Sequence, residues 1–372
     1  MFIDLHIIQN FAPSNLNRDD TGNPKDCEFG GVRRARISSQ CIKRAIRKTP
    51  VFMQTTGVDL GLRTKRMVEF IKKDIVAAGK EPEAAEKIIS QIVETYYSKL
   101  DKNEKPKTAV LLYISAAEKE EMVKSVLDRW GELSVADNKT IVDKLAKDWS
   151  KINQGTTSAP DIALFGRMLA EHPDLNLDAA CQVAHALSTH RVTMEMDYYT
   201  AVDDLNPKDT AGAGMIGFVG FNSACFYRYA CIDWEQLVHN LRGDVVLARR
   251  TVEAFLRASV DAIPTGKQTS FAANNLPGFN FAVVHEDGTP WSLANAFEQA
   301  VRADREGGYF KPSVKALDAY WGRLAKVYGL EKRSHLAALC LDEQPPLQNL
   351  APALKEDLES WIKAVMDALP KE

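Results

Sequence analysis

A basic segment early in the chain has the side chains needed to hold a phosphate. Between Gly30 and Lys48 the sequence contains seven basic residues and no acidic one. Lys43 and Arg47 are four residues apart, so they share a face of the predicted helix. Ser38–Gln40 bring hydroxyl, amide and free backbone donors to the start of that helix, which favours phosphate. The segment predicts a phosphate-binding surface, with a solvated helix face as the alternative.

Charge is distributed unevenly along the chain. The first 50 residues carry nine basic and five acidic side chains, a local net charge of +4, whereas the whole chain has a net charge of −3. This total excludes a generally basic nucleic-acid coat, but a local positive field still attracts phosphate. Gly30 and Gly31 lie in the basic stretch, and we expect them to let the backbone approach a ligand closely, because glycine has no side chain.

A glycine-rich motif, Gly212–Gly217, matches the dinucleotide-binding pattern G-x-G-x-x-G. That function requires a strand before the first glycine and a helix after the last one. Here residues 203–210 are polar and contain Pro207, and Phe218–Phe221 continues as apolar, strand-like sequence. The motif therefore favours a flexible projecting hairpin, with a nucleotide-dependent oxidoreductase as the alternative.

Candidate metal ligands and nucleophiles lack the spacing that catalysis requires. His185 and His190 are five residues apart, whereas two ligands on one helix face need a spacing of four. The six cysteines are scattered without a C-x-x-C pair, which indicates reduced thiols in a cytoplasmic protein. Acid pairs at Asp19–Asp20 and Asp203–Asp204 can bind a cation, although such pairs in loops commonly face water. The sequence therefore predicts no cofactor and no metal site.

The elements that position the basic segment follow from residue periodicity. Phe2–Ile8 alternates apolar and polar residues, which predicts a half-buried strand with Asp4 and His6 away from its apolar side. The next predicted elements are a polar loop over residues 12–31, an extended segment over 32–37, and a helix that runs from a cap at Ser38 or Ser39 to about Lys48.

Helical periodicity dominates residues 57–149, and a long segment without it follows at 200–220. The remaining predicted elements are strands over 221–232 and 279–284, helices over 233–241, 244–263, 292–301, 312–328 and 352–369, and a loop over 264–275. This order predicts an α+β core with two large excursions. A compact domain rarely keeps long loops without a function, so residues 12–31 and 200–220 are functional candidates.

Composition is that of a globular protein. The chain has 372 residues, of which 45 % are hydrophobic and 26 % charged. No apolar run approaches the roughly 20 residues that a membrane helix needs. The first eleven residues lack a basic leader and include Asp4 and His6, so we expect no signal peptide.

Motifs along nearly the whole chain resemble those of one protein family, in matching order. The motifs that carry the resemblance are Leu16–Asp20, Lys25–Asp26, Phe29–Gly31, Arg36–Gln40, Lys43–Arg44, Asp161–Met168, Ala184–His190, Thr200–Leu205, Phe226–Ala230, Gly266–Gln268, Leu293–Glu298 and Tyr328–Leu330. The chain is similar to the CasC-type backbone subunit of type I-E CRISPR Cascade complexes, in the RAMP superfamily. The helical segment matches in type but poorly in residues.

The resemblance implies a right-hand-shaped subunit. It implies an RRM-like (ferredoxin-like) palm for residues 1–56 and 161–372, a helical fingers insertion for 57–160, and a projecting thumb loop at about 200–220. Copies of such a subunit stack head to tail along one guide RNA, and each thumb reaches toward the neighbouring copy and kinks the RNA. The implied function is a scaffold without nuclease activity that presents guide bases to target DNA. The implied partners are guide RNA (crRNA), the target DNA strand, further copies of the chain and other Cascade subunits, in the cytoplasm and without a membrane.

The resemblance and the basic segment together imply a set of RNA-binding residues. Met168 is implied to be an apolar wedge against a displaced base, with an ordinary core methionine as the alternative. Tyr199 is implied to stack on a base in the same way. The others are expected to contact the RNA backbone, which holds position without reading sequence. The residues expected to bind RNA are Arg18, Lys25, Ser38, Gln40, Lys43, Arg44, Arg47, Met168, Tyr199, Lys267 and Gln268.

An enzymatic alternative comes from the same superfamily. Related RAMP backbone subunits cut target RNA in a metal-dependent reaction, with an acidic residue in a loop near the N-terminal strand. Asp19, Asp20 and Asp26 lie in such a loop here. The alternative function is therefore a metal-dependent endoribonuclease.

Overall fold

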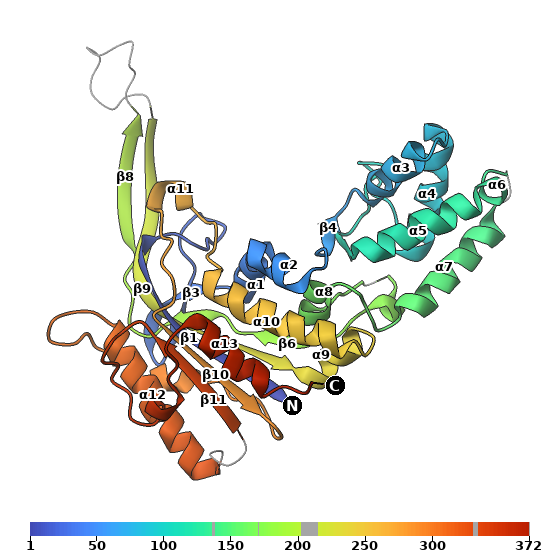
Figure 1. The fold of residues 1–372 in the computed structure, drawn as a ribbon. Coiled ribbons are helices and arrows are strands. Elements are labelled where there is room, and N and C mark those ends of the chain that lie inside the picture. Colours follow the sequence, from blue (N-terminus) through green and yellow to red (C-terminus); the bar gives the residue numbers. More distant parts are fainter. Residues whose placement is uncertain (136–137, 170, 202–214, 330–333, 372) are drawn as a thin grey trace. The chain divides into compact units, whose positions relative to one another are not determined.

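The chain divides into two compact units. The computed structural model describes residues 1–135, 138–169, 171–201, 215–329 and 334–371 (Figure 1). The first unit contains Met1–Phe52, Gln182–Ile232 and Glu253–Pro370. The second contains Met53–Cys181, Asp233–Val252 and Lys371–Glu372.

An antiparallel sheet is the centre of the first unit. Its strands follow the order β11-β10-β1-β9-β7-β3-β2, and β6 and β8 also pair with β9 (Figure 1). The strands are β1 (Phe2–Ser14), β2 (Asp26–Phe29), β3 (Val32–Ile37), β6 (Cys181–Val183), β7 (Ala186–Ser188), β8 (Glu195–Ala201), β9 (Met215–Asp233), β10 (Phe279–His285) and β11 (Ser334–Cys340). The order along the sheet differs from the order along the chain, so most of these pairings are non-local.

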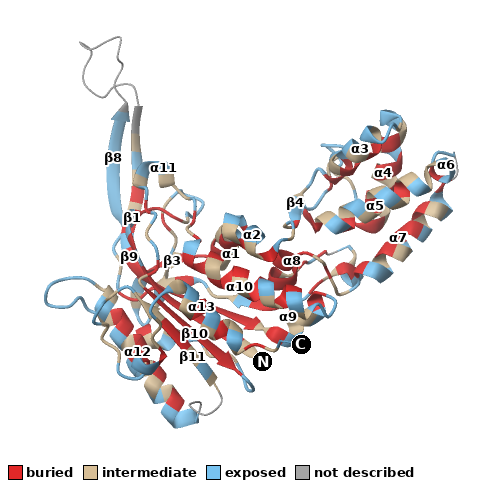
Figure 2. Ribbon diagram, in the orientation of Figure 1, coloured by how far each residue is buried: buried red, intermediate tan, exposed pale blue. Residues whose placement is uncertain are grey.

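Strand β1 is buried on both faces, so the predicted half-buried strand is wrong. Asp4 and His6 are fully buried, and His6 stacks on Phe281, which in turn contacts Trp321 of helix α12 (Phe310–Tyr328). On the other face, Leu5 and Ile7 pack with Ile42 and Ile46 of helix α1 (Ser39–Lys48). Figure 2 shows the resulting continuous burial of the central strands. Helices on both sides of β1 remove its polar side chains from water. The alternation of residues within β1 does not reveal these helices.

The remaining helical elements of the first unit are short or lie near its C-terminus. They are α11 (Gln268–Phe271), α13 (Leu358–Asp367), and the 3₁₀ turns η2 (Ala294–Phe297) and η4 (Ala351–Ala353). The helix predicted over residues 292–301 is wrong, because only the η2 turn forms there. Strand β11 was not predicted, and the predicted loop over residues 12–31 contains strand β2.

The second unit is mainly helical, as the periodicity of residues 57–149 predicts. Its elements are α3 (Met67–Ala77), α4 (Pro82–Tyr96), α5 (Ala116–Asp128), α6 (Trp130–Leu133), α7 (Lys139–Asn153), α8 (Pro160–Phe165), α9 (Trp234–Asn240), the turn η1 (Pro173–Leu175), and the antiparallel strands β4 (Leu62–Thr64) and β5 (Leu112–Ile114). Helices α2 (Pro50–Thr56) and α10 (Val245–Asp261) cross from one unit to the other along the chain. Apolar side chains of α3, α4, α5 and α7 form one buried cluster.

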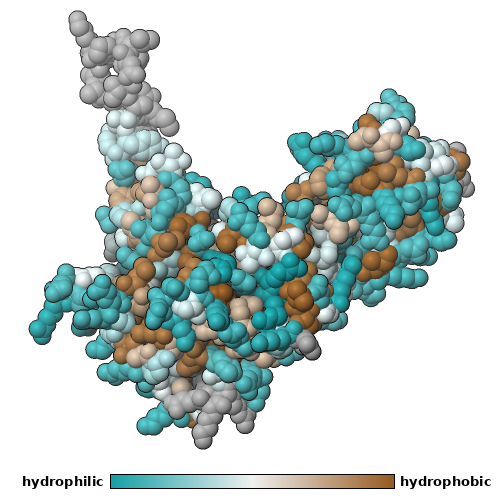
Figure 3. Space-filling view, viewed as in Figure 1, coloured by the Kyte–Doolittle hydropathy of each residue, from teal (hydrophilic) through white to brown (hydrophobic). Residues whose placement is uncertain are grey.

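The surface of each unit mixes polar and apolar side chains. In Figure 3, hydrophilic and hydrophobic residues are interspersed over the face that is drawn. Among the described residues, no helix combines the length and the apolar character needed to cross a membrane.

Candidate nucleic-acid interface

Helix α1 turns one face toward the core and another toward a recess. Ser38 caps the helix: its hydroxyl oxygen accepts a hydrogen bond from the backbone N–H of Cys41, at 3.4 Å. Ile42 and Ile46 are buried against the sheet. The residues of α1 that line the recess, spaced as one helix face, are Cys41, Arg44, Ala45 and Lys48.

Two loops of the same unit complete this recess. Its volume is about 410 Å³, and the loop segments that line it are Leu16–Asp19 and Pro264–Gly266. Arg18, Arg44 and Lys48 are exposed and supply three positive charges, whereas Asp19 supplies one negative charge. We call this feature, lined by Leu16–Asp19, the α1 face and Pro264–Gly266, the cationic recess. Its net positive charge suits a phosphate group.

Two close contacts hold the loops of the cationic recess in place. The side-chain oxygen of Asn17 accepts a hydrogen bond from the Ser38 N–H at 2.8 Å, which ties the first loop to the start of α1. A Cβ added at Gly266 would lie 2.3 Å from the carbonyl oxygen of Leu16. The two loops therefore touch so closely at this point that only glycine fits.

Asp19 is the one carboxylate in the recess lining, and its own loop engages it. Its Oδ1 accepts hydrogen bonds from the Thr21 N–H and hydroxyl, at 2.9 and 2.7 Å, and from the Asn23 N–H at 3.0 Å. These bonds, led by the Thr21 hydroxyl, lower the pKa of Asp19 below its usual value. The carboxylate thus stays ionised and stabilises the loop.

The predicted residues of α1 separate into accessible and buried side chains. Arg44 and Gln40 are exposed, and Lys43 is half-buried. Arg47 is only 5 % exposed, so the prediction that it presents its charge to RNA is wrong. Ser38 is also buried, and its hydroxyl acts as the helix cap. Lys48 lines the recess instead.

Lys48 was missed by the sequence analysis, although a signal for it exists. Arg44 and Lys48 have the same i, i+4 spacing that singled out Lys43 and Arg47. Helical periodicity alone allows either Lys43 and Arg47, or Arg44 and Lys48, to face outward. Only the packing of Ile42 and Ile46 against the sheet decides between them.

Several other basic residues of the early segment serve the fold. The Arg34 guanidinium is fully buried, where it donates hydrogen bonds to the carbonyl oxygens of Phe29, Ser188, Phe297 and Glu298, at 2.8–3.2 Å. Arg33 pairs with Asp26 at 3.1 Å on the surface. The basic charge count therefore overstates the charge available to a ligand.

Gly30 and Gly31 form the turn between β2 and β3, with φ values of +60° and +72°. A Cβ at Gly30 would lie 1.7 Å from the carbonyl oxygen of Glu298. The expectation that this pair lets the backbone approach a ligand is therefore wrong at Gly30, because the close approach is to the chain itself.

Lys267 and Gln268 stand at the start of α11, beside the recess lining. Lys267 adopts a left-handed backbone conformation, with φ of +50°. The Gln268 amide nitrogen donates to the carbonyl oxygens of Pro264 and Ala273, at 3.0 and 3.3 Å. Gln268 thus braces its own loop, so its amide donors are not directed to a ligand. Lys25 is half-buried, and its N–H donates to the Asn17 carbonyl at 2.8 Å.

Tyr199 lies in the hairpin that β8 and β9 form. It pairs with Gly217, and a Cβ at Gly217 would lie 2.2 Å from the Tyr199 ring, which therefore covers the glycine. The ring is 43 % exposed, and Tyr198 and Phe218 beside it are also exposed. Residues 202–214 lie outside the described part of the chain, and with them most of the predicted loop 200–220, including Asp203–Asp204, Pro207 and Gly212–Gly214.

Met168 belongs to the second unit and is 84 % exposed. The alternative of an ordinary core methionine is therefore wrong. Met168 is not among the residues that line the cationic recess.

The histidines singled out by the sequence have structural partners. The Cys225 N–H donates to His190 Nε2 at 3.1 Å, and the other ring nitrogen faces the Arg191 carbonyl at 2.8 Å. His185 Nδ1 lies 3.1 Å from the Arg36 guanidinium. Within the described ranges, no group of three or more His, Cys, Asp or Glu side chains is arranged to hold a metal ion, and the six cysteines form no disulfide bond.

The fold belongs to the mixed α+β class and is built on an antiparallel sheet. A cationic recess lies beside helix α1. A family model described as CT1975-like protein matches residues 3–365. The chain belongs to this family, and the resemblance to CasC-type Cascade backbone subunits is confirmed.

Solved structures support the same assignment. A chain described as "CRISPR RNA-guided surveillance complex, pre-nicking" is 31% identical, with a TM-score of 0.84, and the match covers 99% of this chain and 100% of that one. A second, described as "CRISPR RNA-guided surveillance complex", is 27% identical with a TM-score of 0.76, over 99% and 100% of the two chains. A search of the curated proteins found no match.

Proposed function

We propose that the chain is a guide-RNA-binding scaffold of a CRISPR surveillance complex. Copies assemble head to tail along the crRNA and leave its bases available to pair with a target DNA strand in antiviral defence. Family membership and the similarity to chains of RNA-guided surveillance complexes support this proposal. The cationic recess is the single observation that carries it, because three exposed cations around one recess suit the phosphates of a guide strand.

The parts of the chain take different roles in this proposal. Residues 1–56 and 161–372 are assigned to an RRM-like palm, which contains the antiparallel sheet of the first unit and also residues 161–181 and 233–252 of the second. Residues 57–160 are the fingers, and the segment around 200–220 is the thumb, which reaches the neighbouring copy and kinks the RNA. The assembly works in the cytoplasm with other Cascade subunits.

Guide binding follows from the charges of the recess. Arg18, Arg44 and Lys48 neutralise successive phosphates, while Lys25, Gln40 and Lys43 add weaker contacts beside them. Phosphate contacts fix the register of a strand without reading its bases. Guide RNAs of unrelated sequence should therefore bind with similar affinity.

The scaffold carries out no catalysis in this proposal. Of the loop acids that an endoribonuclease would use, Asp19 holds its own loop and Asp26 pairs with Arg33. No observation favours the nuclease or the oxidoreductase over the scaffold.

The salt dependence of RNA binding tests the proposal. Arg44→Ala combined with Lys48→Ala should flatten the slope of log affinity against log salt by about 1.4, since each lost phosphate contact on single-stranded RNA is worth about 0.7. The matched control is Lys315→Ala with Lys326→Ala, which removes two exposed charges from α12 of the same unit. The control should leave the slope unchanged.

Filter binding with several unrelated single-stranded RNAs measures both the salt slope and the affinity for each sequence. Equal effects of the two double variants would contradict the recess as the binding surface. A loss confined to one RNA sequence would contradict backbone binding.

A further inference from the structure

Three consecutive residues of the second unit have sharply different exposures. Arg167 is 5 % exposed, Met168 84 % and Leu169 2 %. An apolar side chain thus projects into solvent between two buried neighbours. Gly166, with φ of +76°, makes the turn that enters this segment from helix α8.

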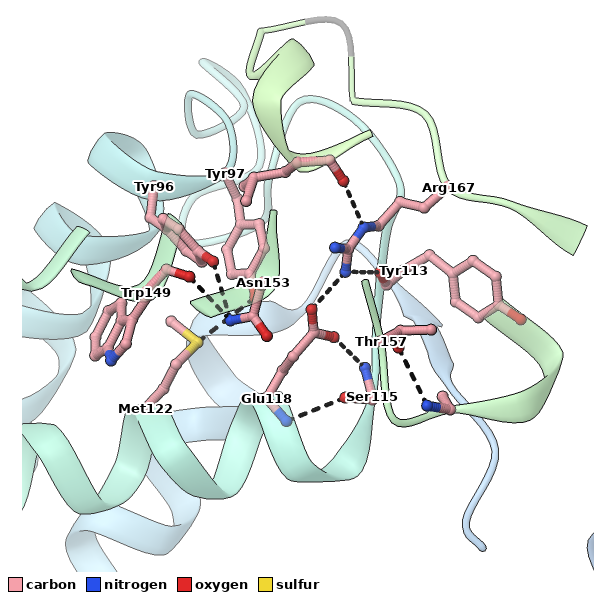
Figure 4. A network of polar contacts seen from close by, with 12 residues as sticks. Tyr96, Tyr97, Tyr113, Ser115, Glu118, Met122, Trp149, Asn153, Thr157 and Arg167 are labelled. Carbon is pink, nitrogen blue, oxygen red and sulfur yellow. Dashed lines mark hydrogen bonds and ion pairs between the residues drawn. The ribbon is translucent and has the colours of Figure 1, made fainter. Parts of the chain in front are cut away.

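Arg167 anchors the segment through a buried ion pair. Its guanidinium lies 2.6 Å from the Glu118 carboxylate, and both side chains are almost fully buried (Figure 4). It also donates to the carbonyl oxygens of Leu175 and Tyr113, at 3.0 and 3.4 Å. Although burial alone lowers the pKa of Arg167, the adjacent Glu118 carboxylate outweighs burial and raises it above the usual value.

Glu118 is itself fixed at the start of helix α5. Its second carboxylate oxygen accepts a hydrogen bond from the Ser115 N–H at 2.6 Å, and the Ser115 hydroxyl accepts one from the Glu118 N–H at 3.1 Å (Figure 4). These reciprocal bonds form a capping box. The ion pair therefore connects the Met168 segment to a rigid helix end.

Leu169 provides the anchor on the other side. Its side chain joins the apolar cluster of the helical unit. Its N–H donates to the Asn176 side-chain oxygen at 2.5 Å. Arg167 and Leu177 also exchange two backbone hydrogen bonds, at 2.9 and 3.0 Å, which close the loop between them.

We propose that Asn176 and the Arg167–Glu118 pair are positioning residues that hold Met168 rigidly outward as a wedge against a nucleobase. This inference rests on the proposed function and on the wedge role against a displaced base that the family resemblance implies for Met168. A methionine side chain is flexible, so a fixed backbone is what determines the point from which it can reach a base. Anchors on both sides supply that fixation, because a binding group works only when its support holds it in place.

Fluorescence of 2-aminopurine reports whether a base is displaced. The probe is a single-stranded guide RNA with 2-aminopurine at successive positions, bound to the full chain. Wild-type protein should raise the fluorescence at regularly spaced positions, where bases leave the stack. Met168→Ala should abolish this rise, and Met168→Leu should retain it.

Asn176 supplies the matched pair of variants. Asn176→Ala removes the acceptor for the Leu169 N–H and should reduce the fluorescence rise by about two-fold or more, because the wedge loosens. Asn176→Asp keeps an acceptor at the same place and should restore the rise. In a Met168→Ala background, Asn176→Ala should leave RNA affinity, measured by filter binding, unchanged.

The outcomes separate this inference from the proposed function. If Met168→Ala removes the signal but Asn176→Ala does not, the positioning role is overturned while guide binding stands. A loss of RNA affinity caused by Asn176→Ala in the Met168→Ala background also overturns it, since Asn176 would then act through general stability. If wild-type protein binds no RNA, the proposed function itself fails.

Discussion

At the scale of the residue, His6 shows how burial controls a titratable group. Its ring stacks on Tyr229 and Phe281, each with ring centroids 5.3 Å away, and its Nδ1 lies 2.9 Å from the Tyr227 hydroxyl. Burial, opposed by Asp4 and reinforced by His285, lowers the pKa of His6 to about 4. The ring is therefore neutral in the folded protein at neutral pH.

This depressed pKa predicts that stability falls on acidification. The unfolded chain binds a proton at His6 near its ordinary pKa, whereas the folded chain binds it only near 4. The stabilisation is complete above about pH 6.5 and is lost as the pH falls toward 4, by on the order of 3 kcal/mol at most. Urea denaturation at pH 7 and pH 4.5 measures this loss.

His6→Phe keeps the stacked ring and removes the titration, so its stability should depend less steeply on pH. His335→Gln, an exposed position on β11, is the matched control and should behave as the wild type. Parallel pH profiles for wild type and His6→Phe would show that His6 does not carry the effect.

At the scale of the element, the sequence predicted those features that depend on contacts between residues close together in the chain. Ser38 caps α1 and Asp233 caps α9, where its carboxylate accepts from the Gln236 N–H at 3.0 Å. A cap and the first turn of its helix are neighbours in sequence, so residue type and spacing are enough to find them. The same is true of the helical periodicity in the second unit.

Non-local packing explains what the sequence did not reveal. Strand β11 depends on pairing with β10, whose residues lie about fifty positions earlier. Arg34 has the charge of a phosphate ligand, yet four carbonyl oxygens accept its hydrogen bonds in the interior, and three of them come from distant segments. The buried side of α1, and hence the choice of Arg44 and Lys48 over Arg47, likewise depends on the sheet below it.

The contact between the two recess loops predicts a sensitive position at Gly266. Gly266→Ala would place a Cβ against the Leu16 carbonyl, which is backbone and cannot rotate away. The loops must separate, at a cost of about 1–3 kcal/mol in stability. RNA affinity should fall with it, because Arg18 moves away from Arg44 and Lys48. Thermal melting and filter binding measure the two effects.

Gly131→Ala is the matched control for this substitution. A Cβ at Gly131, in helix α6, meets no atom within 4 Å. Stability and RNA binding should be unchanged or slightly improved there, since alanine favours a helix more than glycine does. Normal RNA affinity in Gly266→Ala would mean that the loop contact does not shape the binding surface.

At the scale of the whole molecule, charge separates the proposed RNA-binding region from the rest. The first 50 residues have a net charge of +4 and the whole chain −3, which leaves −7 for the remaining residues. Two copies therefore repel each other over most of their sequence, while each attracts RNA through its early segment. Guide RNA supplies the attraction that brings copies together in the proposed assembly.

We accordingly expect assembly to depend on RNA and on its length. Without RNA the purified chain should be a monomer at low salt, where repulsion is least screened. With single-stranded RNAs of increasing length, light scattering should show the number of bound copies rising in steps. The Arg44→Ala, Lys48→Ala double variant should show fewer steps, whereas the Lys315→Ala, Lys326→Ala control should match the wild type. Filaments that form equally well without RNA would mean that contacts between copies, rather than the shared guide, drive the assembly.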